Sequence, residues 1–333
     1  MRILVTGSAG FIGFHLARRF LEQGHDVVGL DGFTPYYDVN LKYARHGLLQ
    51  KYPNFSFHRL MLESPGALAP VFAGKPYDLV LHIAAQAGVR YSLDNPRAYV
   101  DANLVGTFSL MEMLRQYPAG HFMLASTSSI YGANPKVPFA EGDVADEPLT
   151  LYAATKKSTE LMAHSYAHLW GQPTTAFRFF TVYGPWGRPD MAMFKFTQGV
   201  IAGTPVDIYN HGKMSRDFTF IDDLVEAVSR LALLPPRAGD AGASAQAPYR
   251  TINLGGGTPV SLMAFIGAVE AAVGRKAVRN YLPMQKGDVP ATFASTDRLE
   301  ALTGYRPNTP VHMGVPKFVE WFRNYYPSFH STI

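Results

Sequence analysis

A glycine-rich turn between a short apolar strand and a helix stands at the start of the chain and restricts the possible folds most strongly. Residues 2–6 predict a buried parallel strand, and glycines follow at positions 7, 10 and 13. This spacing allows a tight turn, close approach of the backbone to a pyrophosphate, and close packing of helix on strand. A helix expected from near Phe11 points its first amides at the same phosphates. The residues expected to bind a dinucleotide in this turn are Gly7, Ala9, Gly10, Phe11, Ile12 and Gly13.

A second predicted strand, 26–30, leads directly into Asp31. A carboxylate at this place accepts hydrogen bonds from the ribose hydroxyls and repels a 2′-phosphate, which favours NAD over NADP. A glycine triplet alone could be a plain strand-to-helix turn. The order strand, glycines, helix, strand and aspartate indicates a dinucleotide site.

Further apolar runs continue the α/β pattern as far as residue 179. The expected strands are 55–60, 78–83, 121–125 and 174–179, the last completing the parallel set, and a long helix is expected from Pro96 to about Gln116 after a cap at Asp94 and Asn95. A run of mostly small residues that includes Ala84, Ala85 and Gln86 lets backbone lie against a flat ligand. Strands alternating with helices predict a doubly wound parallel sheet.

The alternation loosens after residue 179, which suggests a second, smaller α/β lobe that binds substrate. We expect residues 1–178 to bind the cofactor, with part of 217–260 returning to them, and 179–333 to form mainly the substrate lobe. In this lobe 206–209 is an expected strand, and 213–217 and 286–288 are expected loops.

Composition excludes several classes of function. Hydrophobic residues make up 47% of the chain and charged residues 17%, as in an ordinary soluble enzyme. The net charge of +4 comes without a basic run, which argues against a nucleic-acid surface. The chain has no cysteine and no histidines at metal-ligand spacing, so neither thiolate chemistry nor a metal site is expected, and a reducing cytoplasm fits. We expect no signal peptide, because a strand begins at Arg2, and no membrane span, because no apolar run is long enough.

Tyr152 and Lys156 are four residues apart in a predicted helix, so their side chains share one face. A nearby ammonium group stabilises a phenolate, which can then take a proton from a sugar or steroid hydroxyl. The hydroxyls of Thr127, Ser128 and Ser129 follow the strand 121–125 and should lie at the carboxyl edge of the sheet, where ligands bind. Alone, the Tyr–Lys spacing also fits an exposed helix face, and the hydroxyl cluster a simple turn.

The glycine turn, Asp31, the Thr127 cluster and the Tyr152/Lys156 pair, in this order, resemble the extended short-chain dehydrogenases/reductases over nearly the whole chain. Within them the chain is most similar to the nucleotide-sugar 4-epimerases that act on UDP-glucuronate, on the stretches 31–39, 181–190 and 210–219. The resemblance implies a Rossmann sheet, bound NAD and a UDP-sugar substrate. It implies that Tyr152 is the base, Lys156 its electrostatic partner and a ligand of the nicotinamide ribose, and Thr127 the third catalytic hydroxyl.

The same resemblance implies roles for residues whose pattern alone is uninformative. Asn103 would support the cofactor site, although a mid-helix asparagine is usually neutral. The family's adenine-binding aspartate is replaced by Met61 or Leu62, so looser adenine recognition is expected, with Leu62 beside the cofactor. Arg216 would meet the diphosphate and Asp288 the uridine ribose, and Thr181 and Arg188 would lie near the sugar carboxylate. The full implied substrate set is Arg90, Ser128, Ser129, Thr181, Arg188, Tyr209, Arg216 and Asp288.

The Thr127–Ser129 cluster distinguishes between the reactions of the related enzymes. The sugar dehydratases use an acid–carboxylate pair at the second and third positions, and the UDP-glucuronate decarboxylases carry glutamate at the third. Hydroxyls can position a sugar but cannot run an elimination at neutral pH. We therefore expect UDP-glucuronate and UDP-galacturonate to interconvert through a transient 4-keto sugar. The alternatives are a UDP-glucose/UDP-galactose epimerase, a UDP-glucuronate decarboxylase and a non-catalytic NAD-binding scaffold. A homodimer through the helices near 95–116 and 152–170 is expected by resemblance.

Overall fold

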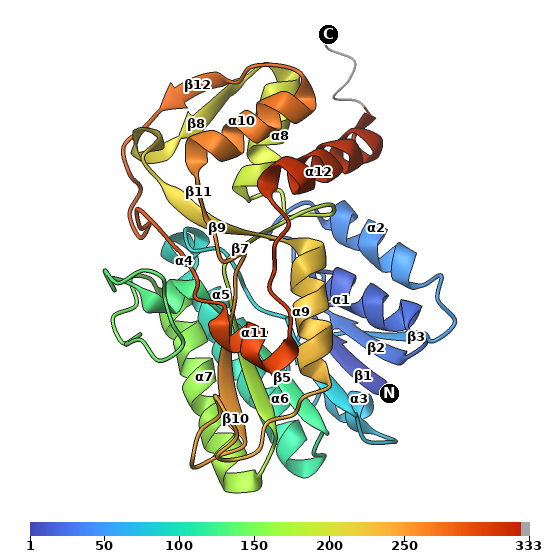
Figure 1. Cartoon of the computed structure of the whole chain (residues 1–333). Helices are drawn as coiled ribbons and strands as arrows, with labels where there is room; N and C mark the ends of the chain where they lie inside the picture. The colour runs from blue at the N-terminus through green and yellow to red at the C-terminus, as the bar shows by residue number, and fades with distance from the viewer. Residues whose placement is uncertain (328–333) are drawn as a thin grey trace.

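The computed structural model describes residues 1–327, which are built on one seven-stranded parallel sheet (Figure 1). Its order is β10-β6-β5-β4-β1-β2-β3. The strands are β1 (Arg2–Thr6), β2 (Asp26–Asp31), β3 (Phe55–Arg59), β4 (Leu79–His82), β5 (His121–Thr127), β6 (Thr174–Phe179) and β10 (Tyr249–Leu254). Because β1 pairs with β2 on one side and β4 on the other, strand order reverses between them, which opens a crevice beyond their carboxyl ends. The predicted doubly wound sheet is confirmed.

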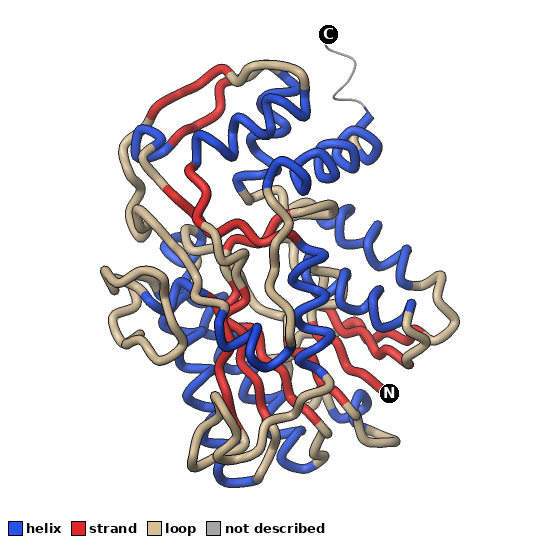
Figure 2. The backbone as a smooth tube through the Cα atoms, viewed as in Figure 1, coloured by secondary structure: helices blue, strands red, loops and turns tan. Residues whose placement is uncertain are grey.

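Helices cover both faces of this sheet, as Figure 2 shows. Ile3 and Val5 of β1 belong to one apolar cluster with Phe14, whereas Leu4 belongs to a second cluster with Leu110. A parallel strand buried on both faces is apolar throughout, which explains the unbroken run 3–5. The helices of this part are α1 (Phe11–Glu22), α2 (Val39–Leu49), α3 (Ala69–Phe72), α4 (Tyr91–Asp94), α5 (Pro96–Tyr99), a π-helical turn (Val100–Val105), α6 (Gly106–Gln116), α7 (Leu151–Trp170), α9 (Ile221–Ala232) and α11 (Asp297–Thr303), with a 3₁₀ turn at Ser128–Tyr131.

A smaller set of elements lies above the carboxyl ends of the sheet, at the top of Figure 1. One group of strands has the order β11-β9-β7, and β12 pairs with β8. Its elements are β7 (Thr181–Tyr183), α8 (Ala192–Ala202), β8 (Pro205–Ile208), a 3₁₀ turn (Tyr209–Gly212), β9 (Ser215–Phe220), β11 (Pro259–Ser261), α10 (Leu262–Val273), β12 (Val278–Tyr281) and α12 (Val311–Tyr325).

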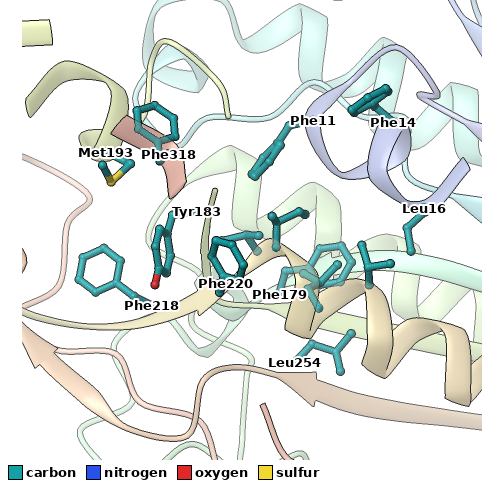
Figure 3. Close-up of a cluster of buried hydrophobic side chains, with 14 of the residues drawn as sticks. Phe11, Phe14, Leu16, Phe179, Tyr183, Met193, Phe218, Phe220, Leu254 and Phe318 are labelled. Atoms are coloured by element: carbon teal, nitrogen blue, oxygen red, sulfur yellow. The ribbon is translucent and has the colours of Figure 1, made fainter. Parts of the chain in front are cut away.

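One apolar core runs through both parts. Phe218 stacks on Phe265 with ring centroids 3.9 Å apart. Figure 3 shows Phe11 and Phe14 of α1 in the same cluster as Met193 and Phe318 of the upper elements. The elements on the substrate side are therefore packed on the same core as the glycine turn.

Two predictions about strands are wrong. β6 does not complete the parallel set, because β10 pairs with it in parallel. The chain reaches β10 only after passing through the upper elements, so local spacing could not reveal the pairing. Arg216 lies on β9 rather than in a loop, in register with Val260 of β11.

The predicted long helix to Gln116 is interrupted. α5 and α6 are separated by the π-helical turn Val100–Val105, and Asp94 belongs to α4 instead of capping the helix. Asn95 occupies the N-cap position of α5, but its side-chain amide donates to the Tyr91 hydroxyl and accepts no bond from a backbone amide of the helix. Within residues 1–327, no helix combines the length and the apolar character that crossing a membrane requires.

Candidate active site

A cavity of about 1190 Å³ opens at the carboxyl ends of the parallel strands and continues beneath the upper elements. The structure brings the predicted residues together here. All of them line the cavity except Ala9 and Asn103, which are buried behind its wall.

The glycine turn leaves no space for side chains where it meets the cavity. A Cβ on Gly7, whose φ is +73°, would lie 2.8 Å from the backbone nitrogen of Ala84. A Cβ on Gly13 would lie 2.1 Å from the carbonyl oxygen of Gly7, so only glycine lets α1 begin this close to β1. In the described chain no side chain caps α1, so its first amides remain available to an anion. This cradle fits the pyrophosphate of a dinucleotide.

Asp31 is held in place by the backbone on both sides of its carboxylate. Oδ2 accepts from the amide of Ala9 at 3.1 Å, and Oδ1 accepts from the amide of Phe33 at 2.8 Å. Ala9 therefore acts by orienting Asp31 and does not line the cavity. Each carboxylate oxygen can accept a further bond, which suits two ribose hydroxyls.

Asp31→Ala is expected to weaken NAD binding roughly tenfold to a hundredfold, since hydrogen bonds to a charged acceptor are lost. The advantage of NAD over NADP should narrow, because the charge that repels a 2′-phosphate is removed. Titration of the protein with each cofactor measures both effects. Asp26→Ala, at the exposed opposite end of the same strand, is the control. An unchanged cofactor preference would show that Asp31 does not bind the ribose.

The place expected for adenine is apolar but has a carboxylate beside it. Met61 packs over Gly32, where an added Cβ would lie 2.0 Å from its sulfur. Leu62 is buried and lines the cavity next to Met61, as predicted. Glu63 also lines the cavity and was not predicted, because only Met61 and Leu62 were expected at this place.

The predicted catalytic residues come from the end of β5 and the first turns of α7. Thr150 caps α7 by accepting from the amide of Ala153 at 3.3 Å, which begins the helix one residue before Tyr152. Thr127 accepts from the amide of Ser129 and donates to its hydroxyl, both at 3.2 Å. Thr127 and Tyr152 line the same cavity. The phenol predicted to be the base and an oriented threonine hydroxyl therefore share this cavity.

The electrostatics of Tyr152 differ in part from expectation. Burial raises the pKa of the Tyr152 phenol, and the hydrogen bond from Thr127 and the charge of Arg188 lower it. Burial lowers the pKa of Lys156 to about 8, with Glu160 acting in the opposite direction. The cation that acts on the phenol here is Arg188, and the influence expected from Lys156 stays a prediction.

Asn103 is held rigidly behind the cavity wall, against Gln86, which lines the cavity. Its Oδ1 accepts from the amide of Gln86 at 2.8 Å, and its Nδ2 donates to the carbonyl of Gln86 at 3.1 Å. The same amide donates to the Thr155 hydroxyl on α7 at 3.1 Å. Asn103 therefore ties the small-residue run to the catalytic helix. Asn103 lies in the π-helical turn Val100–Val105. A prediction that assumes a regular helix could not show that its side chain reaches Gln86.

Another part of the cavity wall carries paired charges. Arg216 donates to Asp288 at 3.0 Å, and Arg90 lies 3.7 Å from the other oxygen of the same carboxylate. The guanidinium of Arg90 also lies over the ring of Tyr209, 4.8 Å from its centroid. These four predicted residues form one cluster, and the binding of a diphosphate by its two arginines stays a prediction. The other predicted residues on the substrate side are Ser128, Ser129, Thr181 and Arg188.

Arg188 has two partners that the prediction missed. Its guanidinium pairs with Asp190, and the Tyr36 hydroxyl donates to Asp190 at 3.1 Å. Tyr36 and Asp190 both line the cavity. Both lie in the stretches 31–39 and 181–190, whose similarity to a family was noted, so these stretches held the available signal.

Comparisons with known proteins agree with this arrangement. The model of the NAD-dependent epimerase/dehydratase family matches residues 3–255. A probable UDP-glucuronate 4-epimerase of Rhizobium meliloti is 59% identical over 341 residues, covering all of both chains. UDP-glucuronate 4-epimerase 1 of Arabidopsis thaliana is 43% identical, over 97% of this chain and 77% of its own. The crystal structure of UDP-glucuronic acid 4-epimerase from Bacillus cereus, in complex with UDP-glucuronic acid and NAD, superposes with a TM-score of 0.89 at 31% identity, over 98% of this chain and 100% of that one.

Proposed function

The chain belongs to the NAD-dependent epimerase/dehydratase family, and we propose that it interconverts UDP-glucuronate and UDP-galacturonate by epimerisation at C4. The observation that carries the proposal is that Arg188 lines the same cavity as Tyr152 and Thr127. An arginine beside the proton acceptor suits a sugar that carries a carboxylate. The relatives named for this reaction support the same substrate.

The residues around C4 remove the proton of the 4-hydroxyl and later return it. When bound, NAD supplies a reversible acceptor for the hydride of C4. Tyr152 accepts the proton of the 4-hydroxyl, and Thr127 donates a hydrogen bond to the same oxygen. After the 4-keto sugar has presented its opposite face, Tyr152 returns the proton, so the protein ends each cycle unchanged. Ser128 and Ser129 position the sugar, and Lys156 binds the nicotinamide ribose.

The charged cluster of Arg90, Arg216 and Asp288 suits the nucleotide part of the substrate. Arg216 and Arg90 bind the diphosphate, and Asp288 accepts from the uridine ribose. In the structure both arginines pair with Asp288, so a bound diphosphate replaces Asp288 as the partner of some of their N–H groups. The sugar can turn about its link to the diphosphate while the nucleotide part stays fixed.

The proposed division of labour follows the chain. Residues 1–178, with the returning part of 217–260, bind NAD, and 179–327 mainly bind the UDP-sugar. Residues 328–333 of the predicted lobe lie outside the described residues. A homodimer forms through α6 and α7 in this proposal, since these helices expose the apolar side chains of Phe108, Leu161, Leu169 and Trp170.

The test is to incubate purified protein with UDP-glucuronate, without added NAD, and to follow the sugar by NMR. Formation of UDP-galacturonate supports the proposal and shows that the cofactor remains bound. Conversion of UDP-glucose alone would instead indicate a neutral-hexose epimerase, and a UDP-4-keto-pentose would indicate a decarboxylase. Absence of all three products from protein loaded with NAD would overturn the enzymatic proposal.

This substrate brings a chemical hazard that the site has to control. Oxidation at C4 leaves the C5 carboxylate β to a ketone, and such acids lose carbon dioxide easily. Loss is fast only when the C5–carboxylate bond lines up with the carbonyl π system, because its electrons then pass into an enolate. In our proposal Thr181 gives the carboxylate a hydrogen bond and Arg188 gives it a charged one, and together they hold it out of alignment.

Thr181→Ala or Arg188→His is therefore expected to divert some turnovers to a UDP-4-keto-pentose and to leave NADH on the enzyme. Weakening the restraint by about 1.4 kcal/mol raises this loss roughly tenfold if that free energy appears fully in the barrier. NADH absorbance and mass spectrometry of the decarboxylated sugar measure the effect. If both variants lose epimerisation without more decarboxylation than wild type, the two residues only bind substrate.

A further inference from the structure

The loop that carries Arg188 is fastened to the segments that form the cofactor site. The Nε2 of His15 on α1 lies 2.9 Å from the carbonyl oxygen of Pro185. Arg45 on α2, which is fully buried, donates to the carbonyl oxygen of Trp186 at 2.6 Å and to that of Ala9 in the glycine turn at 3.0 Å. These contacts fix the loop up to Trp186. Arg188 itself needs a further support.

That support is the carboxylate of Asp190. Arg188 donates from Nε to Oδ1 at 3.0 Å and from Nη2 to Oδ2, so the pair is bidentate. Tyr36 donates to Oδ2 from the other side at 3.1 Å, and its ring lies 5.9 Å from the guanidinium carbon. Burial and the charge of Asp190 raise the pKa of Tyr36 to about 12, so the hydroxyl remains a donor at neutral pH.

Tyr36 has little freedom to move. A Cβ on Gly88 would lie 2.4 Å from its hydroxyl oxygen, so backbone without a side chain closes one side. The ring of Tyr91 lies 4.8 Å from the Tyr36 ring. The hydroxyl of Tyr99 bonds the carbonyl oxygen of Gly88, and the Tyr99 ring meets that of Tyr152 edge-on at 6.0 Å. The turn behind Tyr36 is thus also tied to the catalytic tyrosine.

We propose that Tyr36 and Asp190 are positioning residues that hold the guanidinium of Arg188 in the orientation that receives the sugar carboxylate. The proposal deepens the proposed function and rests on it. Asp190 occupies the Nε/Nη2 edge of the guanidinium and leaves the Nη1 end for a second carboxylate. A guanidinium that is already oriented loses less side-chain freedom on binding and controls direction better. The direction of the hydrogen bond from Arg188 decides whether the sugar carboxylate stays out of alignment with the ketone.

Tyr36→Phe tests this because it removes only the hydroxyl that supports Asp190. Affinities for UDP-glucuronate and UDP-glucose are measured by calorimetry on NAD-loaded protein carrying Tyr152→Phe, so that no turnover intervenes. We expect Tyr36→Phe to weaken UDP-glucuronate binding about tenfold and to leave UDP-glucose binding within about twofold. In the active enzyme the decarboxylated share of product should rise by a similar factor.

Tyr43→Phe is the matched control, since Tyr43 is a half-exposed tyrosine on α2 that stacks on Phe33 and does not line the cavity. It should leave both measurements unchanged. Asp190→Asn should reproduce the effect of Tyr36→Phe, because the bidentate ion pair is lost.

Equal loss of both sugars, or an unchanged product ratio, would make Tyr36 merely structural and overturn the proposal. Tighter binding of UDP-glucuronate to Asp190→Asn would also overturn it, since Asp190 would then be a competitor of the substrate. A wild-type protein that does not convert UDP-glucuronate defeats the proposed function. A wild-type protein that converts it while Tyr36→Phe behaves identically defeats only the positioning role.

Discussion

Tyr152→Phe is expected to lower turnover roughly a thousandfold, as general-base groups contribute on this scale. Binding of NAD and of the UDP-sugar should stay nearly intact, because the substitution removes one oxygen and leaves the ring against Tyr99. The 4-hydroxyl would then have no side chain to take its proton.

Steady-state kinetics with UDP-glucuronate and calorimetric titration of the same variant measure the two expectations separately. Tyr166→Phe is a suitable control, since Tyr166 lies on the same helix and bonds Glu112 outside the cavity. A Tyr152→Phe enzyme that keeps more than a tenth of the wild-type rate would have lost only about 1.4 kcal/mol of transition-state stabilisation. Tyr152 would then not be the base.

A buried ion pair on the helix of Tyr152 is expected to dominate the stability of the site. Arg178 of β6 donates to both oxygens of Glu160, at 3.0 and 2.9 Å, and both side chains are 4% exposed. Arg178 also donates to the Tyr131 hydroxyl at 2.9 Å, and Tyr131 donates to Asn253 of β10 at 2.7 Å. This network joins the catalytic helix, two strands and the segment after Thr127.

Glu160→Gln should lower the free energy of unfolding by about 3–5 kcal/mol, because it leaves the charge of Arg178 buried without a counter-charge. Chemical denaturation of wild type and of each variant named in this paragraph measures the change in the free energy of unfolding. Glu22→Gln, which breaks the exposed pair with Arg18, should cost at most about 1 kcal/mol. The double variant Glu160→Gln/Arg178→Met should recover part of the loss, since no unpaired charge remains. If Glu160→Gln costs no more than Glu22→Gln, the buried pair does not stabilise the fold.

The cofactor side could be predicted from the sequence because its signals are local. The glycine turn, the strand that ends at Asp31 and the helix of Tyr152 each depend on a few neighbouring residues, and the structure places all of them around one cavity. The substrate was predicted from the similarity of whole stretches, 31–39, 181–190 and 210–219, to a family. The family and the reaction are confirmed by the relatives, whereas the roles of individual residues stay predictions.

What the sequence could not reveal depends on residues that are far apart in the chain. Part of 217–260 was expected to return to the cofactor part, but the pairing of β10 with β6 is formed only after the chain has built the upper elements, and no local pattern indicates that pairing. Tyr36 and Asp190 meet across 154 positions. Neither Arg188 nor Asp190 signals by itself that the guanidinium is already paired, because a loop arginine two residues from an aspartate can equally be solvated.

The π-helical turn at Val100–Val105 also limits how the chain can change in length. A π turn holds one residue more than an α-helical turn, so deleting a residue there would restore a regular helix. A residue inserted into or deleted from the regular flanking helices would instead rotate their two ends by about 100° relative to each other. Tyr99 packs toward the catalytic tyrosine on one side, and Leu110 packs into the core under the sheet on the other. Both contacts cannot survive such a rotation, so a change in length is expected to be tolerated only within the π-helical turn and not in α5 or α6.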